Sequence, residues 1–301
     1  MDTQIDGQMV EQVRRFNRLV TQRAGALDDH YLARGRALGA SRVLWEIGSG
    51  CEIRQLRARL GLDSGYLSRI LRSLEADGLV ATGSSDNDAR VRTVRLTSAG
   101  RHERALLDRR SDRLAESVLG SLAPDQRERL VTAMHDVERL LTAATVEIDV
   151  VDPEDPRAQH CLRSYFGELD ERFRAGFDPR ATRGTDPSEW RAPAGRFLMA
   201  TLWDEPVGCG AVRFHDDVAE IKRMWVAPHA RGLGLGRRLL TELESAAADG
   251  GATTVRLDTN KALVEAIAMY LATGYVEIDD YNGEPYADHW FEKRLGGPSD
   301  R

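Results

Sequence analysis

Apolar residues in the first half of the chain recur with the spacing of an amphipathic helix. Within residues 63–77 they stand at positions i, i+3, i+4 and i+7, as Leu67, Ile70, Leu71 and Leu74. Asp63 is a suitable N-cap for this helix, and Gly78 is suitable for ending it. A shorter helix is predicted over residues 52–60, with Gly61 in the turn between the two helices. This spacing predicts a helix-turn-helix unit.

A β-hairpin is predicted directly after this unit. Residues 79–82 and 91–96 have strand-like patterns, and the polar residues 83–90 separate them. A hairpin in this place predicts the wing of a winged helix-turn-helix domain. Long amphipathic helices are predicted on both sides of the module, over residues 8–24, 98–119 and 124–144.

The second half of the chain alternates between strand-like and helix-like patterns. A first strand is predicted over residues 146–151 and a helix over residues 157–174, followed by a polar loop over residues 177–193. The later elements are strands at 197–203, 206–214 and 220–226, a helix at 239–248, a strand at 254–258, and a helix at 262–271. This alternation predicts an α/β domain.

Length and charge agree with two domains. The chain has 301 residues, which exceeds the usual size of one domain, and helical periodicity fades near residue 145. We therefore expect one domain over residues 1–145 and a second over residues 146–301. The first holds 23 arginines, no lysine and 20 acidic residues, so its formal net charge is +3 against −9 for the remainder. This asymmetry suggests one nucleic-acid-binding module and one module of another kind.

Cysteine and histidine usage gives no sign of disulfides or metal sites. Cys51, Cys161 and Cys209 form no C-x-x-C pair, which is typical of reduced thiols in a cytoplasm. The seven histidines show no metal-binding spacing, so no metal is expected. The first thirty residues lack a secretory signal pattern, and no apolar run approaches the length of a membrane span. We expect a soluble, cytoplasmic protein that does not contact a membrane.

A glycine-rich turn, residues 231–238, joins the strand at 220–226 to the helix that follows. Glycines at its centre remove the side chains that would hold an anion away from the main-chain amides. The first N–H groups of a helix have no partner within it and favour anions, so the turn predicts a phosphate site. A dinucleotide fingerprint would need glycine where Arg237 stands, and a P-loop would need Gly-Lys-Ser/Thr at its end. Both alternatives are therefore excluded.

The turn and its flanks resemble the coenzyme A loop of the GNAT N-acetyltransferase superfamily. The pattern Arg231-x-x-Gly234-x-Gly236 follows a strand, and a helix, a strand, Asn260 and a helix with Tyr270 come after it. The resemblance implies an α/β fold with a mixed sheet and acetyl-CoA as co-substrate. It also implies transfer of an acetyl group to the amine of a small molecule.

The resemblance assigns a role to each matching residue. Main-chain groups of the strand at 220–226 would bind the pantetheine arm, and amides of the turn would bind the pyrophosphate. Tyr270 would protonate the leaving thiolate. Glu220 would accept the proton of the amine, a role for which Asp258 competes. The expected cofactor-binding residues are Met224, Trp225, Val226, Arg231, Gly232, Leu233, Gly234, Leu235, Gly236, Arg237 and Asn260.

Plainer interpretations of these residues stay open. Tyr270 also suits a core aromatic, Glu220 a solvated strand residue, and Asn260 an ordinary turn. Further candidates for lining the acceptor pocket are Tyr281, Tyr286 and His289.

The winged module resembles the MarR family of regulators. The motifs that carry the resemblance are Leu74-Glu75-x-x-Gly78-Leu79-Val80, Asp88-x-Arg90 and Leu96-Thr97-x-x-Gly100. The resemblance implies a homodimer on a double-stranded DNA operator, with Arg90 in the minor groove and Asp88 bracing it. The polar face of the helix at 63–77 suits a major groove. The expected DNA-binding residues are Ser64, Tyr66, Ser68, Arg69, Arg72, Asp88 and Arg90.

Two classes of function fit this architecture. In the first, the chain is a DNA-binding transcriptional regulator that is also an acyl-CoA-dependent N-acetyltransferase. In the second, it is a transcription factor whose GNAT half only senses coenzyme A or a metabolite. A protein-lysine acetyltransferase is a further alternative. The glycine turn together with Tyr270 and Asn260 favours the enzyme.

Overall fold

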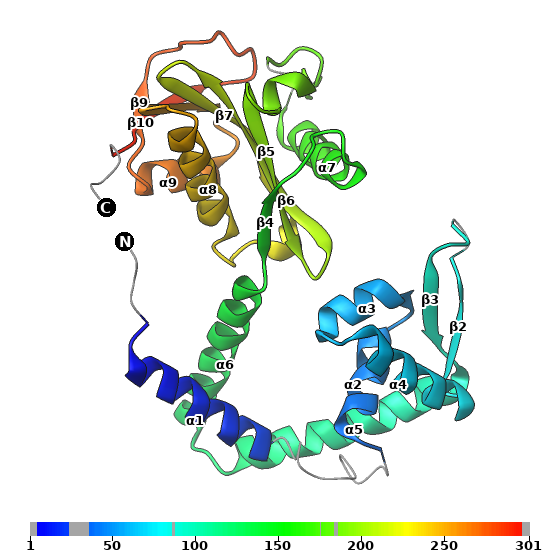
Figure 1. The fold of residues 1–301 in the computed structure, drawn as a ribbon. Helices are drawn as coiled ribbons and strands as arrows, with labels where there is room; N and C mark the ends of the chain where they lie inside the picture. The colour runs from blue at the N-terminus through cyan, green and yellow to red at the C-terminus, as the bar shows by residue number, and fades with distance from the viewer. Residues whose placement is uncertain (1–4, 24–35, 86–87, 175, 184–185, 297–301) are drawn as a thin grey trace. The chain divides into compact units, whose positions relative to one another are not determined.

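The chain forms two compact units, Met1–Val131 and Thr132–Arg301. The computed structural model describes residues 5–23, 36–85, 88–174, 176–183 and 186–296 (Figure 1). The division falls within helix α6 (Pro124–Ala144), ahead of the boundary expected at residue 145. The last turn of α6 lies in the second unit and is bonded there, because Arg238 Nη1 donates to the carbonyl of Ala143 at 3.5 Å and to that of Val146, just after the helix, at 2.7 Å. The domain boundary at residue 145 stays a prediction.

Helices form most of the first unit, and a small sheet forms its wing. The described helices are α1 (Gly7–Arg23), α2 (Leu38–Ile47), α3 (Ile53–Leu60), α4 (Ser64–Ala76), α5 (Ser98–Gly120) and the start of α6. The described strands, in sheet order, are β1 (Cys51–Glu52), β3 (Arg92–Leu96) and β2 (Val80–Ser84). The predicted helix-turn-helix and wing are confirmed. The helix expected over residues 52–60 begins at Ile53 instead, because Cys51 and Glu52 pair with β3.

The core of the first unit forms beneath α4. The apolar stripe predicted for this helix is buried, and it packs with Val43, Leu44 and Ile47 of α2. Helix α2 was not among the predicted elements. Asp63 caps α4, since its Oδ1 accepts the N–H of Tyr66 at 2.8 Å. The polar face of α4 is thereby left outward.

The second unit is an α/β layer structure. Its described strands are β4 (Glu147–Val150), β5 (Gly195–Leu202), β6 (Glu205–His215), β7 (Val218–Val226), β8 (Thr254–Thr259), β9 (Val276–Ile278) and β10 (His289–Arg294). Its helices are α7 (Pro156–Arg172), α8 (Leu235–Asp249) and α9 (Val264–Ala272), with short 3-10 helices at Pro187–Trp190 and Pro228–Ala230. Within the described residues the strands form one mixed sheet in the order β4-β5-β6-β7-β8-β10-β9. The predicted mixed-sheet α/β domain is confirmed.

Two helices cover opposite faces of this sheet (Figure 1). On one face α8 approaches β6 closely, because a Cβ at Gly208 would lie 3.1 Å from Leu239, and a Cβ at Gly210 only 2.6 Å from Leu243. On the other face, Cys161 of α7 lies against the carbonyl of Gly208 at 3.7 Å. Glycines in β6 therefore let α8 and its preceding turn lie close to the sheet.

The neighbouring strands β7 and β8 separate along their length. They pair in parallel from Val218 opposite Thr254 to Ile221 opposite Leu257, and no register continues beyond that point. On its other side β7 has a register irregularity against β6, and Arg223 adopts a φ of +59° there. The second half of β7 thus has main-chain groups free of β8, and the sheet opens at the carboxyl end of these strands.

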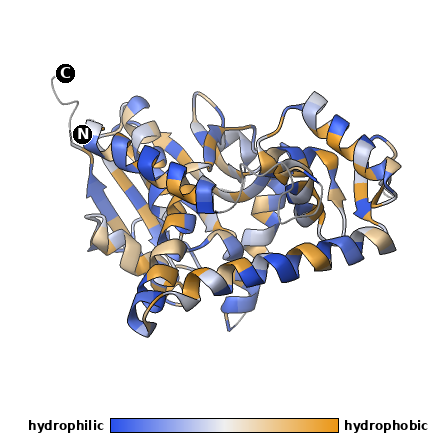
Figure 2. Cartoon of the chain, turned by 90° about the horizontal axis from the view of Figure 1, so that it is seen from below, coloured by the Kyte–Doolittle hydropathy of each residue, from blue (hydrophilic) through white to orange (hydrophobic). Residues whose placement is uncertain are grey.

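Hydrophilic and hydrophobic residues follow one another along the helices (Figure 2). In the part of the chain that the structure describes, every helix is too short or too polar to cross a membrane.

Gly100 provides a test of packing in the first unit. A Cβ at this position would lie 1.9 Å from the carbonyl oxygen of Leu79, so we expect Gly100→Ala to lower the free energy of unfolding by about 2 kcal/mol or more. Gly120 lies at the end of the same helix with nothing within 4 Å of its Cβ position. Gly120→Ala should therefore be neutral or mildly stabilising. Urea unfolding of both variants measures the difference, and equal effects would contradict the packing described here.

Candidate functional site

Two cavities meet where β7 and β8 separate. An outer cleft of about 630 Å³ runs between α7, the second half of β7, the glycine turn and α9. An inner pocket lies deeper, at the ends of β7 and β8. The two share part of their lining: Tyr165, Leu169, Met224, Leu263, Ala266 and Tyr270. A long ligand in the outer cleft would therefore reach the inner pocket with one end.

The glycine turn lies along the outer cleft. Gly232 and Gly234 have φ values of +80° and +75°, in the left-handed region that glycine tolerates. A Cβ at either position would meet nothing within 4 Å, so the space beside the turn is open to a ligand. Helix α8 begins at Leu235, earlier than the expected residue 239, and its first amides are the unpartnered donors of a helix N-terminus. The turn therefore has the geometry of a phosphate site.

Ion pairs fix the wall of the cleft beside this turn. Glu168 of α7 accepts the indole N–H of Trp225 at 3.0 Å and also binds the guanidinium of Arg231. Arg231 in turn donates from Nε to the carbonyl of Val226 at 3.1 Å. These contacts tie the splayed half of β7 to both α7 and the turn.

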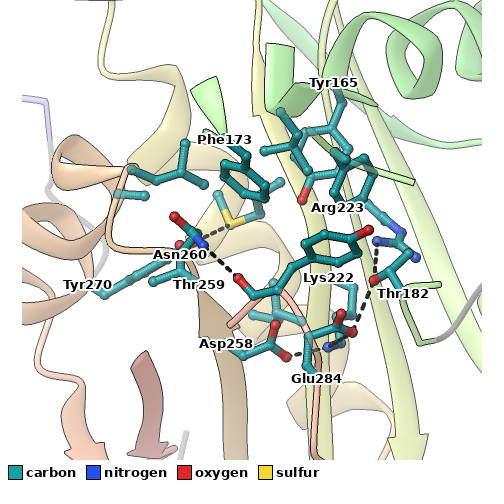
Figure 3. Close-up of a pocket in the computed structure, with 17 residues that line it drawn as sticks. Tyr165, Phe173, Thr182, Lys222, Arg223, Asp258, Thr259, Asn260, Tyr270 and Glu284 are labelled. Carbon is teal, nitrogen blue, oxygen red and sulfur yellow. Dashed lines mark hydrogen bonds and ion pairs between the residues drawn. The ribbon is translucent and has the colours of Figure 1, made fainter. Parts of the chain in front are cut away.

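The inner pocket combines aromatic walls with buried charges (Figure 3). Its volume of about 70 Å³ has room for roughly five water molecules. Figure 3 shows Tyr165 and Phe173 in its upper part with Arg223 beside Tyr165, and Asp258, Glu284 and Lys222 below them. Phe177 and Tyr286 extend the aromatic wall, with ring centroids 4.7 Å apart. The pocket thus suits a small group that is apolar on one side and polar on the other.

Lys222 joins two carboxylates at the polar side of this pocket. Its Nζ pairs with Asp258 Oδ1 and lies 3.8 Å from Glu284 Oε2. Oε2 of Glu284 also accepts from Thr182 Oγ1 at 3.0 Å and from the N–H of Arg183 at 2.9 Å. The other oxygen, Glu284 Oε1, is buried without a hydrogen-bond partner among the described residues. A donor on a bound molecule would satisfy it.

Burial raises the pKa of Asp258 above its usual value, against the opposing charge of Lys222. A carboxylate with a raised pKa is a better proton acceptor. Asp258 is therefore the lining carboxylate with the electrostatics of a general base.

Glu220 has a different environment. It is buried but does not line either cavity, and its Oε1 accepts from Tyr281 at 2.9 Å and from Asn282 at 2.8 Å. Its Oε2 accepts from Arg213 Nε at 2.6 Å. Burial by itself would raise its pKa, but the charges of Lys222 and Arg213 outweigh it and lower the pKa to about 2. These contacts do not favour Glu220 as the base, and that role stays an untested prediction.

Tyr270 lies at the junction of the two cavities. Its side chain is buried, and its hydroxyl is 3.9 Å from the sulfur of Met224 on the splayed strand. Burial raises the pKa of Tyr270 well above that of a free tyrosine. The phenol is therefore protonated at neutral pH and can donate a proton to a group placed between the cavities.

The polar face of α4 forms a second candidate surface, in the first unit. Ser64, Tyr66, Ser68, Arg69 and Arg72 are all exposed on it. The guanidinium of Arg69 lies 5.8 Å from the centroid of the Tyr66 ring, so the ring helps to position it. Hydroxyl and guanidinium groups on one helix face are suited to reading base edges and phosphates.

The wing carries an arginine near its tip. Asp88 Oδ1 accepts the main-chain N–H of Arg90 at 2.9 Å, so it braces the loop and leaves the Arg90 side chain exposed. At the base of the wing, Glu75 of α4 accepts both the N–H and the hydroxyl of Thr82, at 3.0 and 2.9 Å. These bonds fix the wing to α4. Residues 86 and 87 of the loop lie outside the described part of the chain.

Comparison with family models matches both units. Residues 143–275 match the acetyltransferase (GNAT) family, and residues 40–91 match the MarR family. The chain joins a MarR-type domain to a GNAT acetyltransferase domain. The splayed strand, the glycine turn and Tyr270 thus lie in the GNAT domain, and α4 and the wing lie in the MarR-type domain.

Individual relatives cover parts of the chain. The GNAT domain is similar to an IAA acetyltransferase from Azospirillum brasilense, with 38% identity over 87 residues, which are 28% of this chain and 57% of the relative. The MarR-type domain is similar to the uncharacterized HTH-type transcriptional regulator YdgJ from Bacillus subtilis strain 168, with 27% identity over 79 residues, 26% of this chain and 48% of the relative. The first curated relatives are matched over about a third to just over half of their length.

Two of the similar solved structures each cover about half of this chain. A GNAT-family acetyltransferase from Staphylococcus aureus Mu50 is 16% identical at a TM-score of 0.43, covering 50% of this chain and 100% of that chain. Streptococcus pneumoniae FabT, in complex with DNA, is 18% identical at a TM-score of 0.37, covering 45% of this chain and 97% of that chain.

The expected cofactor-binding residues of the GNAT domain mostly lie together. All of them line the outer cleft except Leu233, which packs against the core, and Asn260, which lines the inner pocket. Asn260 donates to the carbonyl of Tyr286 at 2.7 Å and accepts from the N–H of Ala262 at 2.9 Å, so it also shapes the loops there. In the described residues, no group of histidine, cysteine or acidic side chains is arranged to hold a metal.

Of the acceptor-pocket candidates, the structure places Tyr286 in the inner pocket. Tyr281 binds Glu220 instead, and His289 lies 2.6 Å from Glu277. The sequence analysis did not predict that Lys222, Thr182 and Glu284 line the pocket. Their only signal is polarity in a strand and two loops, which does not show that they converge.

Glu220 predicts a pH-dependent contribution to stability. Because its pKa in the folded protein is lowered to about 2, its contribution is present above pH 4.5 and is lost as the pH falls toward 2. We expect Glu220→Gln to lower the free energy of unfolding at pH 7 by about 3 kcal/mol, and by progressively less toward pH 3. Urea unfolding across this range measures the effect. Asp149→Asn, at an exposed position of β4, is the matched control, and a pH-independent loss would contradict the ion-pair assignment.

Proposed function

We propose that the GNAT domain transfers the acetyl group of acetyl-CoA to the amine of a small molecule, and that the MarR-type domain binds a DNA operator. The observation that carries the enzymatic proposal is the position of Tyr270. It stands where the phosphate-binding cleft opens into a small pocket with buried carboxylates. An acetyl donor in the cleft and an acceptor in the pocket would meet there.

The outer cleft has main-chain hydrogen-bonding groups that suit coenzyme A. The turn offers amides free of Cβ atoms, and the splayed half of β7 offers main-chain groups that an extended pantetheine arm can pair with as an added strand. When bound there, acetyl-CoA supplies the activated acetyl group. The thioester end would lie near Met224 and Tyr270.

The inner pocket fits an amine. An ammonium group satisfies the buried Oε1 of Glu284, and Asp258 accepts its proton to leave the free base. The amine nitrogen then bonds to the acetyl carbon while the carbon–sulfur bond breaks, and the nitrogen releases its second proton to solvent to become the neutral amide. Tyr270 donates its phenolic proton to the departing sulfur and regains one from solvent.

The size of the inner pocket favours a small acceptor over a protein lysine. A pocket of this volume, lined by five aromatic rings, has room for a compact head group. The second candidate is a regulator that only senses coenzyme A. It is favoured by the presence of a MarR-type domain and a GNAT domain in one chain. Retention of Tyr270 beside paired carboxylates favours the enzyme, because sensing alone needs neither.

The MarR-type domain suits a dimer on DNA. Helix α1 exposes a row of apolar side chains that no described element covers: Met9, Val10, Val13, Phe16, Leu19 and Val20. Such a face in a terminal helix favours a second copy of the chain, and a two-fold dimer places two α4 helices on a pseudopalindromic site. A cytoplasmic location follows from this proposal, because the operator is there.

Acetyl transfer is tested by thiol release from acetyl-CoA with a panel of small amines. We expect turnover with at least one amine, and Tyr270→Phe should lower kcat by about 100-fold while leaving the Kd of acetyl-CoA nearly unchanged. Asp258→Asn should also lower kcat, and activity of the wild type should fall as the pH drops through the raised pKa of Asp258. Coenzyme A binding without turnover on any amine would select the sensing function instead.

DNA binding is tested by gel shift on the region upstream of the protein's own gene. Arg90→Ala should weaken binding about ten-fold and reduce the slope of log affinity against log salt by about 1, because one cationic contact is lost. Arg113→Ala removes an exposed arginine of α5 and should leave the shift unchanged. Equal behaviour of the two variants at matched salt would refute the role of the wing.

A further inference from the structure

The last turns of α6 reach the glycine turn of the GNAT domain. Arg139 Nη1 donates to the carbonyl of Gly232 at 3.0 Å, and Nη2 lies 3.5 Å from Asp136 one turn earlier. Both partners of this contact belong to the compact unit Thr132–Arg301. The Arg139 side chain is 44% exposed and lines the outer cleft together with the glycines of the turn. An arginine from outside the strand–turn–helix motif therefore stands at the phosphate site.

The charges around the cleft are unevenly paired. Its lining includes four arginines and two glutamates, namely Arg139, Arg172, Arg231, Arg237, Glu168 and Glu265. Both glutamates are engaged: Glu168 pairs with Arg231 and Arg172, and Glu265 pairs with Arg172. Arg237 forms no ion pair among the described residues, and Arg139 has only the long contact with Asp136, so the cationic excess of the lining lies at these two arginines beside the glycine turn.

We propose that Arg139 is a ligand for a phosphate group of coenzyme A, supplied by α6. This inference rests on the proposed binding of coenzyme A and adds a residue that neither the glycine turn nor β7 contains. A guanidinium has five donors in a planar fork that matches phosphate oxygens. Arg139 uses one donor on Gly232 and one weakly on Asp136, so further donors are available to an anion in the cleft.

Hydrogen bonds hold the end of α6 beside the glycine turn, the position from which Arg139 can contact a phosphate. Arg238, in the first turns of α8, donates to the carbonyl of Val146 at 2.7 Å, just after α6. The bond from Arg139 to Gly232 fixes the same helix to the turn from its other side. The arginine is thus held beside the phosphate site before any ligand arrives, which lowers the entropic cost of binding. Phosphate binding in turn would hold the last turns of α6 more firmly.

The test is calorimetric binding of coenzyme A and of 3′-dephospho-coenzyme A to the full-length protein. We expect Arg139→Gln to weaken binding of coenzyme A about ten-fold, because one charge-assisted contact at a half-exposed site is lost. Arg139→Lys should recover part of the affinity. Arg129→Gln, on the same helix but not in the lining of the cleft, should bind like the wild type.

The two ligands show which phosphate Arg139 contacts. If the penalty of Arg139→Gln disappears with the dephospho form, the contact is to the 3′-phosphate; if it persists, the contact is to the pyrophosphate. Either result supports the proposal. Equal affinities of wild type and Arg139→Gln for both ligands would overturn it while leaving coenzyme A binding intact. A wild type that binds neither ligand would instead overturn the proposed function.

Amide hydrogen exchange distinguishes a ligand contact of Arg139 from a purely structural role, because a structural role would not make protection depend on the ligand. Coenzyme A should slow exchange in the last turns of α6 in the wild type and leave these turns unchanged in Arg139→Gln, at matched ligand saturation. Equal protection of these turns in both proteins would exclude a contact between Arg139 and the bound ligand.

Discussion

The separation of strands β7 and β8 is the constraint on which both cavities of the GNAT domain depend. Pairing ends with Ile221 opposite Leu257, and the irregularity at Arg223 turns the following residues away from their neighbours. An opening in a sheet leaves main-chain donors and acceptors that must be satisfied from elsewhere. Here that requirement becomes a binding surface, since a ligand with amide groups of its own can replace the missing strand.

A buried network of charges closes the inner end of this opening. Lys222 lies among three carboxylates, Glu220, Asp258 and Glu284, and Arg213 binds Glu220 from the other side. Buried charges of one sign would be costly by themselves, and pairing them offsets the loss of hydration. The network shifts the pKa values of two neighbouring carboxylates in opposite directions. The pKa of Glu220 is lowered, so Glu220 stays ionised within the sheet. Burial raises the pKa of Asp258, which favours the protonated form that a general base adopts after it accepts a proton.

Local patterns predicted the parts of the site that are contiguous in sequence. The glycine turn, the strand before it, the helix with Tyr270 and the wing are each short segments whose spacing carries the geometry, and the two domain types followed from them. The polar side of the inner pocket was not predictable in this way. Thr182 and Glu284 are 102 residues apart and meet only because two loops fold over the same strand ends. The hydrogen bonds of Glu220 to Arg213 and Tyr281 were not predictable either, because its position on the strand does not show which side chains will contact it.

Helix α6 runs without interruption from the compact unit that contains the wing into the one that contains the glycine turn. Its first turns and its last turns are therefore counted in different units although they belong to one helix. An acetyltransferase cut from this chain at residue 146 would lose the helical turns that Arg238 and Gly232 hold in place. The transferable part of this fusion is therefore larger than the sheet of the GNAT domain, and a transplant to another regulator must take the end of the connecting helix with it.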